Sequence, residues 1–441
     1  MLHSRSLALL VGCASLAFTT GTSAQTFTFL EAGFTQELWG THDGFLGGVA
    51  FAPDGDVLAN GCQGYLGPLF RWDSQSTIVV NGTAIHPELA SMPSDVGCGM
   101  VNHPDGGLYS NTLQGVKRID PDTGLLLGAG SLEVGNVLSI AVDPQTGDLW
   151  WIRSGLQIRR TPPDLSPGAD YSTALVGIFD LIDGMYFDPS GDYLFIATRG
   201  PSTLTVFHRS LGVEQQIPMV SPPDGVAVHE QAGFVLTTNV DGTISKFTFP
   251  SNDYSLPPVE TVFASGGFRS DLSQVGADGY LYLTQEGTRY DDGTVTTENS
   301  IVRIGPGFVR PPGVCWNRYG TAAADLLGQV PRLSLDGCMK IGETTDIVTS
   351  GLTGIGCLLI GFEAVDVPAF HGTILVNPAI GISHPIFPPT LDRVSFEMPL
   401  DPDLVDLPLF MQEFAIAQTL LGLNDIAVVS FSRGLRTVIQ P

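Results

Sequence analysis

Positive charge is scarce in this sequence. Of its 441 residues, 20 are Lys or Arg and 45 are Asp or Glu, so the formal net charge is −25, and Lys occurs only at positions 117, 246 and 340. A surface this acidic repels phosphate backbones, which argues against a nucleic-acid partner. The same acidity fits solubility outside the cell or affinity for divalent cations, and composition alone leaves both open.

Long apolar runs are also missing after the first 24 residues. No later stretch approaches the ~18 apolar residues of a membrane-spanning helix, so we expect no transmembrane segment in the mature chain. The N-terminus has the pattern of an export signal: His3 and Arg5 precede the apolar run 7–18, and the small residues 22–24 offer a cleavage site. We predict a signal peptide over 1–24 and a secreted, periplasmic or cell-surface protein. An alternative is a lipobox at 10–13, with Cys13 carrying a lipid.

Familiar catalytic and zinc-binding patterns are absent. The sequence has no GxSxG, HExxH or phosphate-binding loop, and no CxxC or Cys/His spacing typical of zinc. An exported protein permits disulfides. Cys62 and Cys98 fall in neighbouring units of the repeat described next, which favours a bond between them. The pairing among Cys315, Cys338 and Cys357 is open.

Gly and Pro, in contrast, are abundant. The chain has 53 Gly and 31 Pro, which favours short strands joined by turns over long helices. An alternating strand, a tight turn and a second strand recur six times, beginning at residues 48, 99, 139, 184, 225 and 272. Strand-rich repeats of roughly 40–50 residues are typical of a β-propeller. We therefore predict an all-β fold with a six-bladed β-propeller over 25–308, whose ring is closed by a strand from residues 26–34.

The composition changes after the sixth unit. Pro311, Pro312 and Gly313 predict a stiff linker over 309–314. The rest of the chain, 315–441, has further strand patterns parted by Gly/Pro turns and predicts a β-sandwich. Within the repeats, the segment "DLWWI" (148–152) alternates, so we expect one of its two Trp side chains in the core and the other at the surface.

Three Asp residues occupy one position of the repeat. In a propeller the residue before the innermost strand points toward the mouth of the central channel. At this position the six units have, in chain order, Gly47, Cys98, Leu138, Asp183, Asp224 and Asp271. Three carboxylates on one axis repel each other unless a cation lies among them or one takes a proton, and oxygen-only ligands suit Ca²⁺ or Mg²⁺. In the alternative interpretation each Asp is a turn residue that accepts local backbone N–H bonds.

The repeats resemble six-bladed propellers of the NHL and gluconolactonase/senescence-marker-protein kind. That resemblance implies a divalent metal that polarises a lactone carbonyl and activates water, with an Asp as general base. Asp224 in "PPDGVAV" matches the Asp of that family, whereas Asp183 stands where an Asn is expected. Gly47 stands at the position of a Glu, and Leu138 at that of a second Asn, with Asn136 two residues away.

The last part, with "GTILVNP" and "VVSFSRGL", resembles the C-terminal β-sandwich of exported planctomycete-type proteins, where it is an accessory module. Two functions follow from these observations. The first is an exported binding or scaffold protein whose propeller presents its channel mouth or loops to a small molecule, glycan or protein. The alternative is a divalent-metal-dependent, lactonase-like hydrolase, with Asp183, Asp224 and Asp271 around Ca²⁺ or Mg²⁺ and Asp224 as catalytic base.

Overall fold

The structure is a computed structural model that describes most of residues 26–311 and much of 316–439. Its description leaves out residues 1–25, 53–54, 62–65, 105–106, 113–114, 129–137, 154–156, 167–168, 172–181, 230–232, 312–315, 320–322, 324–330, 337, 351–354, 370–371, 380–381, 387–392, 406, 419–426, 433 and 440–441. The predicted signal peptide and the alternative lipid site at Cys13 lie outside the described residues.

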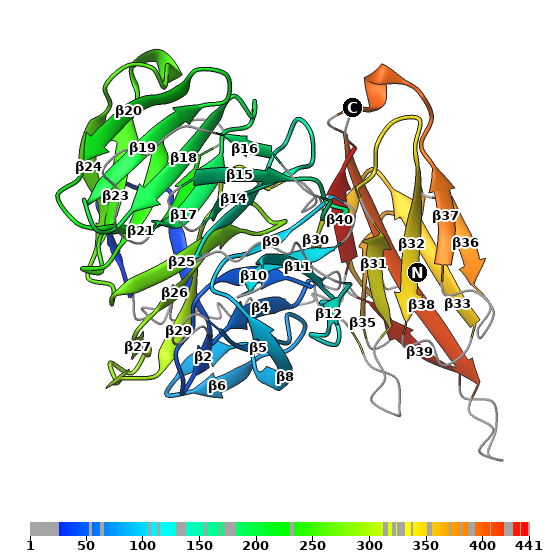
Figure 1. Cartoon of the computed structure of the whole chain (residues 1–441). Helices are drawn as coiled ribbons and strands as arrows, with labels where there is room; N and C mark the ends of the chain where they lie inside the picture. Colours follow the sequence, from blue (N-terminus) through cyan, green and yellow to red (C-terminus); the bar gives the residue numbers. More distant parts are fainter. Residues whose placement is uncertain are drawn as a thin grey trace, which may run out of the picture.

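The described chain consists of strands, turns and two short 3₁₀ turns, which confirms the predicted all-β fold class. None of its helical segments is long and apolar enough to cross a membrane. Six antiparallel sheets of four or five strands follow one another along the first part (Figure 1). Their first strands are β3 (Val49–Phe51), β9 (Met100–Asn102), β13 (Ile140–Val142), β17 (Ile182–Phe187), β21 (Pro223–Val228) and β25 (Ser270–Val275).

The second and third strands follow the first along the chain in each sheet, apart from a hairpin inserted in the last one. The second strands are β4 (Val57–Asn60), β10 (Leu108–Thr112), β14 (Leu149–Arg153), β18 (Tyr193–Thr198), β22 (Val235–Asn239) and β26 (Leu281–Gln285). The third strands are β5 (Gly67–Trp72), β11 (Gly115–Ile119), β15 (Gln157–Thr161), β19 (Thr203–His208), β23 (Ile244–Thr248) and β29 (Asn299–Gly305). The outer strands are β8 (Glu88–Val96), β12 (Leu126–Leu127), β16 (Ala169–Tyr171), β20 (Gly212–Pro218), β24 (Val259–Ser265) and β2 (Thr35–His42).

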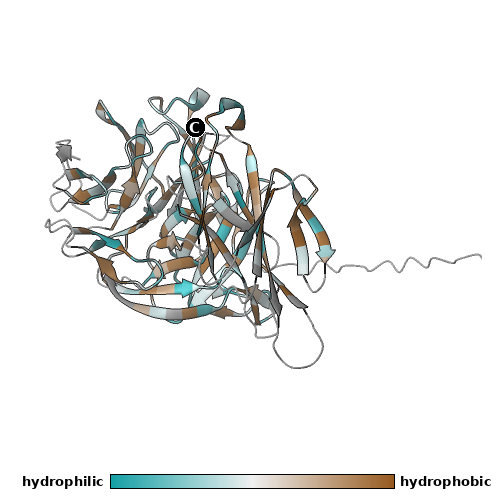
Figure 2. Ribbon diagram, turned by 90° about the vertical axis from the view of Figure 1, so that its right-hand side faces the viewer, coloured by the Kyte–Doolittle hydropathy of each residue, from teal (hydrophilic) through white to brown (hydrophobic). Residues whose placement is uncertain are grey.

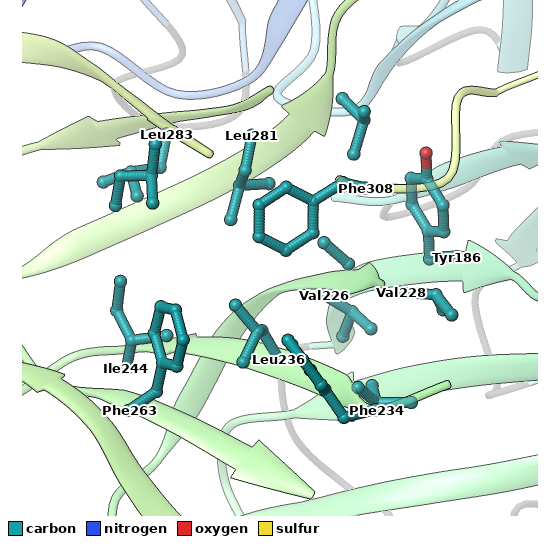
Figure 3. Packing of buried hydrophobic residues seen from close by; sticks show 14 of the residues in the cluster. Tyr186, Val226, Val228, Phe234, Leu236, Ile244, Phe263, Leu281, Leu283 and Phe308 are labelled. Atoms are coloured by element: carbon teal, nitrogen blue, oxygen red, sulfur yellow. The ribbon is translucent and has the colours of Figure 1, made fainter. Parts of the chain in front are cut away.

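The sheets are arranged around an axis. Each first strand contacts the first strand of the next sheet, and β25 contacts β3, so the order closes into a ring, as in a β-propeller. A radial sheet cannot bury both of its faces alone, and in this arrangement each sheet covers its neighbour. Figure 3 shows one such layer, where Phe308 lies beside Leu281 and faces Val226 and Leu236.

The N-terminal strand closes the ring, but not with the predicted residues. The pair Thr28–Phe29 (β1) adds to the outer edge of the fifth sheet by pairing with β24. The closing strand is β2, which pairs with β29 of the sixth sheet. The expectation that 26–34 closes the ring is therefore wrong. β2 takes this place because it buries Leu38 and Trp39 in two different apolar clusters.

Side chains also connect neighbouring sheets near the axis. Asn60, at the end of β4, donates to the Cys98 carbonyl of the next sheet at 3.3 Å, and Asn111, in β10, donates to the Ser139 carbonyl at 3.1 Å. Thr284, in β26, donates across the closure of the ring to the Gly47 carbonyl at 2.7 Å. These bonds satisfy backbone carbonyls of residues that lie just before the first strands.

The chain leaves the sixth sheet through an anchored segment. Phe308 is fully buried, and the Val309 N–H donates to the Val228 carbonyl at 2.8 Å. Tyr186 Oη also donates to the Val309 carbonyl. Val309, the first residue of the predicted linker, is thus bonded to the fourth and fifth sheets.

Beyond residue 315 the described strands form a six-stranded and a three-stranded sheet (Figure 1). The larger sheet contains β30 (Trp316–Tyr319), β33 (Ile355–Gly361), β36 (Ile382–Ile386), β38 (Pro408–Gln418), β39 (Ala427–Phe431) and β40 (Gly434–Val438), and the smaller contains β31 (Arg332–Asp336), β32 (Thr344–Ser350) and β37 (Arg393–Glu397). Both sheets supply one apolar cluster, for example Leu358 and Met411 from one and Ile347 from the other. Figure 2 shows hydrophobic residues along these strands. Two sheets that share one apolar cluster are compatible with the β-sandwich, which stays a prediction.

Three small hairpins complete the described strands. β34 (Ala364–Ala369) and β35 (Gly372–Val376) contact the larger C-terminal sheet, where Gln412 donates to the Thr373 carbonyl at 2.8 Å. In the ring, β6 (Ile78–Val80) and β7 (Thr83–Ile85) form one hairpin, and β27 (Thr288–Arg289) and β28 (Val295–Thr296) form another.

The cysteines are only partly described. Cys98 and Cys338 are disulfide-bonded, and Cys357 is a free thiol. Cys62 and Cys315 lie outside the described residues, so the predicted Cys62–Cys98 bond stays a prediction.

Candidate functional site

The three Asp residues predicted to meet at the channel mouth lie at the starts of three adjacent first strands. Asp183 is in β17, Asp224 in β21 and Asp271 in β25, and β21 contacts both of the other strands. The antiparallel register of each sheet shifts at this point, between Ile182 and Gly184 in the fourth sheet. Equivalent shifts fall between residues 223 and 226 and between 270 and 273. A bulge re-aims the side chain that it carries, and here three bulges carry the three Asp residues.

The repeat glycines bring these strands close together. A Cβ on Gly184 would stand 2.5 Å from the Asp224 carbonyl oxygen, and one on Gly225 would overlap the Ser273 side chain. Neither glycine has a positive φ among the backbone angles of the described chain, so the requirement is close approach rather than an unusual turn. The glycine of the repeat thus sets the spacing between the strands that carry the carboxylates.

Two of the three carboxylates are buried and lack hydrogen-bond partners in the described part of the chain. Asp224 has no exposed surface and Asp183 is 4% exposed, whereas Asp271 is partly exposed. Neither oxygen of Asp224 has a hydrogen-bond partner in the described part of the chain, and the same holds for Oδ2 of Asp183. Asp271 Oδ1 accepts the Leu272 N–H at 3.0 Å. The turn interpretation therefore describes Asp271 only, because the Asp224 carboxylate accepts no backbone N–H bond from the described residues.

One guanidinium stands beside two of the carboxylates. Arg199 follows β18, and its Nη1 lies 3.7 Å from Asp183 Oδ2 and 4.0 Å from Asp224 Oδ2. These distances allow attraction but exceed those of a hydrogen bond. A second cation, Arg269, precedes β25 and is paired with Glu286 at 2.5 Å. Arg199 is therefore the more loosely held charge at the mouth.

Burial dominates the titration of the cluster. Burial and the charge of Asp271 together raise the pKa of Asp183 to about 7, although Arg199 and Arg269 oppose the rise. Burial raises the pKa of Asp271 to about 6 against the same two arginines. The pKa of Asp224 lies well above its usual range because of burial and the two neighbouring carboxylates. Without a further cation, the cluster retains part of its protons near neutral pH, and Asp271 releases its proton before Asp183.

The second and third sheets have apolar residues at the repeat position that carries Asp in the next three sheets. Cys98 and Leu272 are buried against each other, and the partly exposed Phe45 and Leu138 pack on them. We call these four residues the apolar arc and the three Asp residues the acidic arc. The arcs adjoin in the sixth sheet, where Leu272 directly follows Asp271.

The chemistry of the acidic arc fits a hard cation, since its donors are oxygens and three of them are buried without a partner in the described residues. As they are placed, however, the described residues include no group of three or more His, Cys, Asp or Glu that could hold a metal ion. The positions where the lactonase resemblance expects a Glu and an Asn supply no further metal ligand. They hold Gly47 and Leu138, whose side chains have no oxygen donor, and the nearby Asn136 lies outside the described residues.

Sequence comparison within the repeats missed the arginines and the bulges. Arg199 was detectable in principle, because a second strand runs antiparallel to the first and returns to the same end of the sheet. Thr198 indeed pairs with Ile182, so Arg199 follows β18 at the end of the sheet where β17 begins, and its long side chain reaches Asp183. A one-residue bulge leaves no comparable signal in the strand pattern.

No protein-family model matches the sequence, and no curated protein matches it. Among solved structures, one described as a proposed gluconolactonase is 15% identical with a TM-score of 0.45, over 64% of this chain and 96% of its own. A gluconolactonase of Xanthomonas campestris is 15% identical with a TM-score of 0.43, over 61% and 91%. A streptogramin B lyase is 12% identical with a TM-score of 0.39, over 62% and 97%. Likenesses this distant concern the fold and say nothing about the reaction.

Proposed function

We propose that this chain is an exported, cation-dependent hydrolase of small lactones or related esters, with its site at the mouth of a six-bladed propeller. The observation that carries the proposal is the acidic arc, in which three neighbouring sheets each place a carboxylate at a bulge. Six sheets in closed order support the blade count. The C-terminal β-sandwich, whose apolar cluster is separate from those of the ring, is proposed as an accessory module.

Asp183, Asp224 and Asp271 do not form a metal-binding group as they are placed, so they would have to draw together to hold a divalent cation such as Ca²⁺ or Mg²⁺. Bound there, the cation would polarise the carbonyl of the ester and lower the pKa of water. The chain itself supplies the general base: ionised Asp224, buried and free of hydrogen bonds to described residues, accepts the proton of the attacking water. Arg199, which is partly exposed, orients the polar end of the ligand at the entrance.

A binding or scaffold protein without catalysis is the second candidate. It is favoured by the position of Arg199, whose guanidinium already offsets the charge of Asp183 and Asp224. A mouth neutralised by its own arginine and by shared protons needs no metal, and it could hold a small molecule or a glycan through hydrogen bonds alone.

Metal analysis of the purified protein and of Asp224→Ala separates the two functions. We expect about one Ca²⁺ or Mg²⁺ per chain and hydrolysis of at least one member of a lactone panel, both lost in the variant. Asp366→Ala, an exposed residue of the C-terminal part, is the control and should change neither. If the protein binds no divalent cation and hydrolyses no lactone, the hydrolase proposal is wrong and the binding or scaffold function is favoured.

A further inference from the structure

We infer that the ligand of this mouth is amphipathic: a small lactone or ester that carries an apolar alkyl substituent. The inference rests on the proposed function and names its substrate class. It starts from the division of the mouth, whose fourth to sixth sheets carry the acidic arc. The second and third sheets carry Cys98 and Leu138 at the same position of the repeat.

The apolar arc has two buried residues and two residues that keep part of their surface exposed. Cys98 and Leu272 are 6% and 7% exposed, and Phe45 and Leu138 pack on them while keeping part of their own surface exposed. Apolar surface at the entrance of a site gains free energy when a ligand covers it. Binding sites combine such surface with a few polar groups that fix the ligand's orientation, as the acidic arc can do here.

The two arcs meet, so a single small molecule can contact both. Leu272 belongs to the apolar arc and directly follows Asp271 of the acidic arc across the bulge of β25. A carbonyl at the acidic arc therefore directs its substituent over Leu272 and toward Leu138 and Phe45. A polyhydroxylated ligand of the same size would press hydroxyl groups against these side chains, where they lose their hydrogen bonds to water without replacement.

Calorimetric titration with γ-lactams, which resist hydrolysis, tests this inference apart from catalysis. The probes are the unsubstituted lactam and lactams with four- and eight-carbon chains. We expect affinity to rise by about threefold to fourfold per methylene over the first four carbons, the increment for burying a methylene. Leu138→Ser should weaken binding of the four-carbon lactam by about tenfold or more and leave the unsubstituted lactam unchanged.

Leu127→Ser is the control, since Leu127 is exposed on the outer strand β12, at the opposite edge of its sheet from the first strand. Affinity that ignores chain length, a Leu138→Ser protein that matches Leu127→Ser, or no binding of any lactam overturns the inference. Chain-length-dependent binding by a protein that hydrolyses no lactone supports the inference and removes the proposed catalysis. Lactone hydrolysis without an effect of chain length on binding supports the proposed catalysis and overturns the inference about the alkyl substituent.

Discussion

At the scale of single residues, one guanidinium lies close to two buried carboxylates: Arg199 Nη1 is 3.7 Å from Asp183 Oδ2 and 4.0 Å from Asp224 Oδ2. Asp183, Asp224 and Asp271 were predicted to converge because they share one position of a repeat. Arg199 was missed because it follows a second strand, a position that the alignment of the first strands does not compare. The burial of Asp183 and Asp224 could not be predicted either, because a turn Asp and a buried Asp look alike in sequence.

Replacing Arg199 by Gln should strengthen divalent-cation binding by about tenfold, because it removes a positive charge within 4.0 Å of two carboxylate oxygens. The gain is modest because the guanidinium is partly exposed and screened by solvent. Calcium titration by calorimetry measures it. Arg393→Gln, in an exposed ion pair with Asp346, is the control. Weaker calcium binding in Arg199→Gln would mean that Arg199 supports the cation site instead of competing with it.

At the scale of elements, the strand-turn-strand pattern predicted the first two strands of each sheet, because alternation and turn residues are local signals. The same reasoning gave a wrong prediction for Trp150 and Trp151. One was expected in the core and one at the surface, yet both are fully buried, in two different clusters. Alternation assumes that one face of a sheet meets water, whereas neighbouring sheets cover both faces here.

The close contact of β17 with β21 gives a prediction at this scale. Gly184→Ala would place a methyl group 2.5 Å from the Asp224 carbonyl and 3.0 Å from the Val226 nitrogen, so the two strands must move apart. We expect a loss of about 1–3 kcal/mol in unfolding free energy together with loss of calcium binding, because Asp183 and Asp224 separate. Denaturant unfolding and calcium titration measure the two effects.

Gly128→Ala is the control for that variant, since Gly128 has a φ of 73° and open space around the added methyl group. It should lose about 1 kcal/mol through backbone strain and keep calcium binding. If Gly184→Ala keeps both its stability and its calcium binding, the glycine of the repeat does not set the spacing of the mouth.

At the scale of the whole molecule, the ring and the C-terminal sheets have separate apolar clusters, so we expect two thermal unfolding transitions. Glu413 in β38 allows the transition of the C-terminal part to be told from that of the ring. Its side chain is fully buried, and neither carboxylate oxygen has a hydrogen-bond partner in the described part of the chain. Burial raises the pKa of Glu413 to about 8, whereas an unfolded Glu titrates near its ordinary value of about 4.3.

The folded state therefore holds this proton over a range in which the unfolded state has released it. Stability is unaffected by Glu413 below about pH 4 and falls as the pH rises toward 8, by up to about 1.4 kcal/mol per pH unit. Glu413→Gln stays neutral, so at pH 7.5 it should raise the transition of the C-terminal part by several degrees, whereas at pH 4 the two proteins should melt together. Calorimetry at both pH values measures this, with calcium added to mark the transition of the ring. A Glu413→Gln protein less stable than the wild type at pH 7.5 would show that the carboxylate has a stabilising partner.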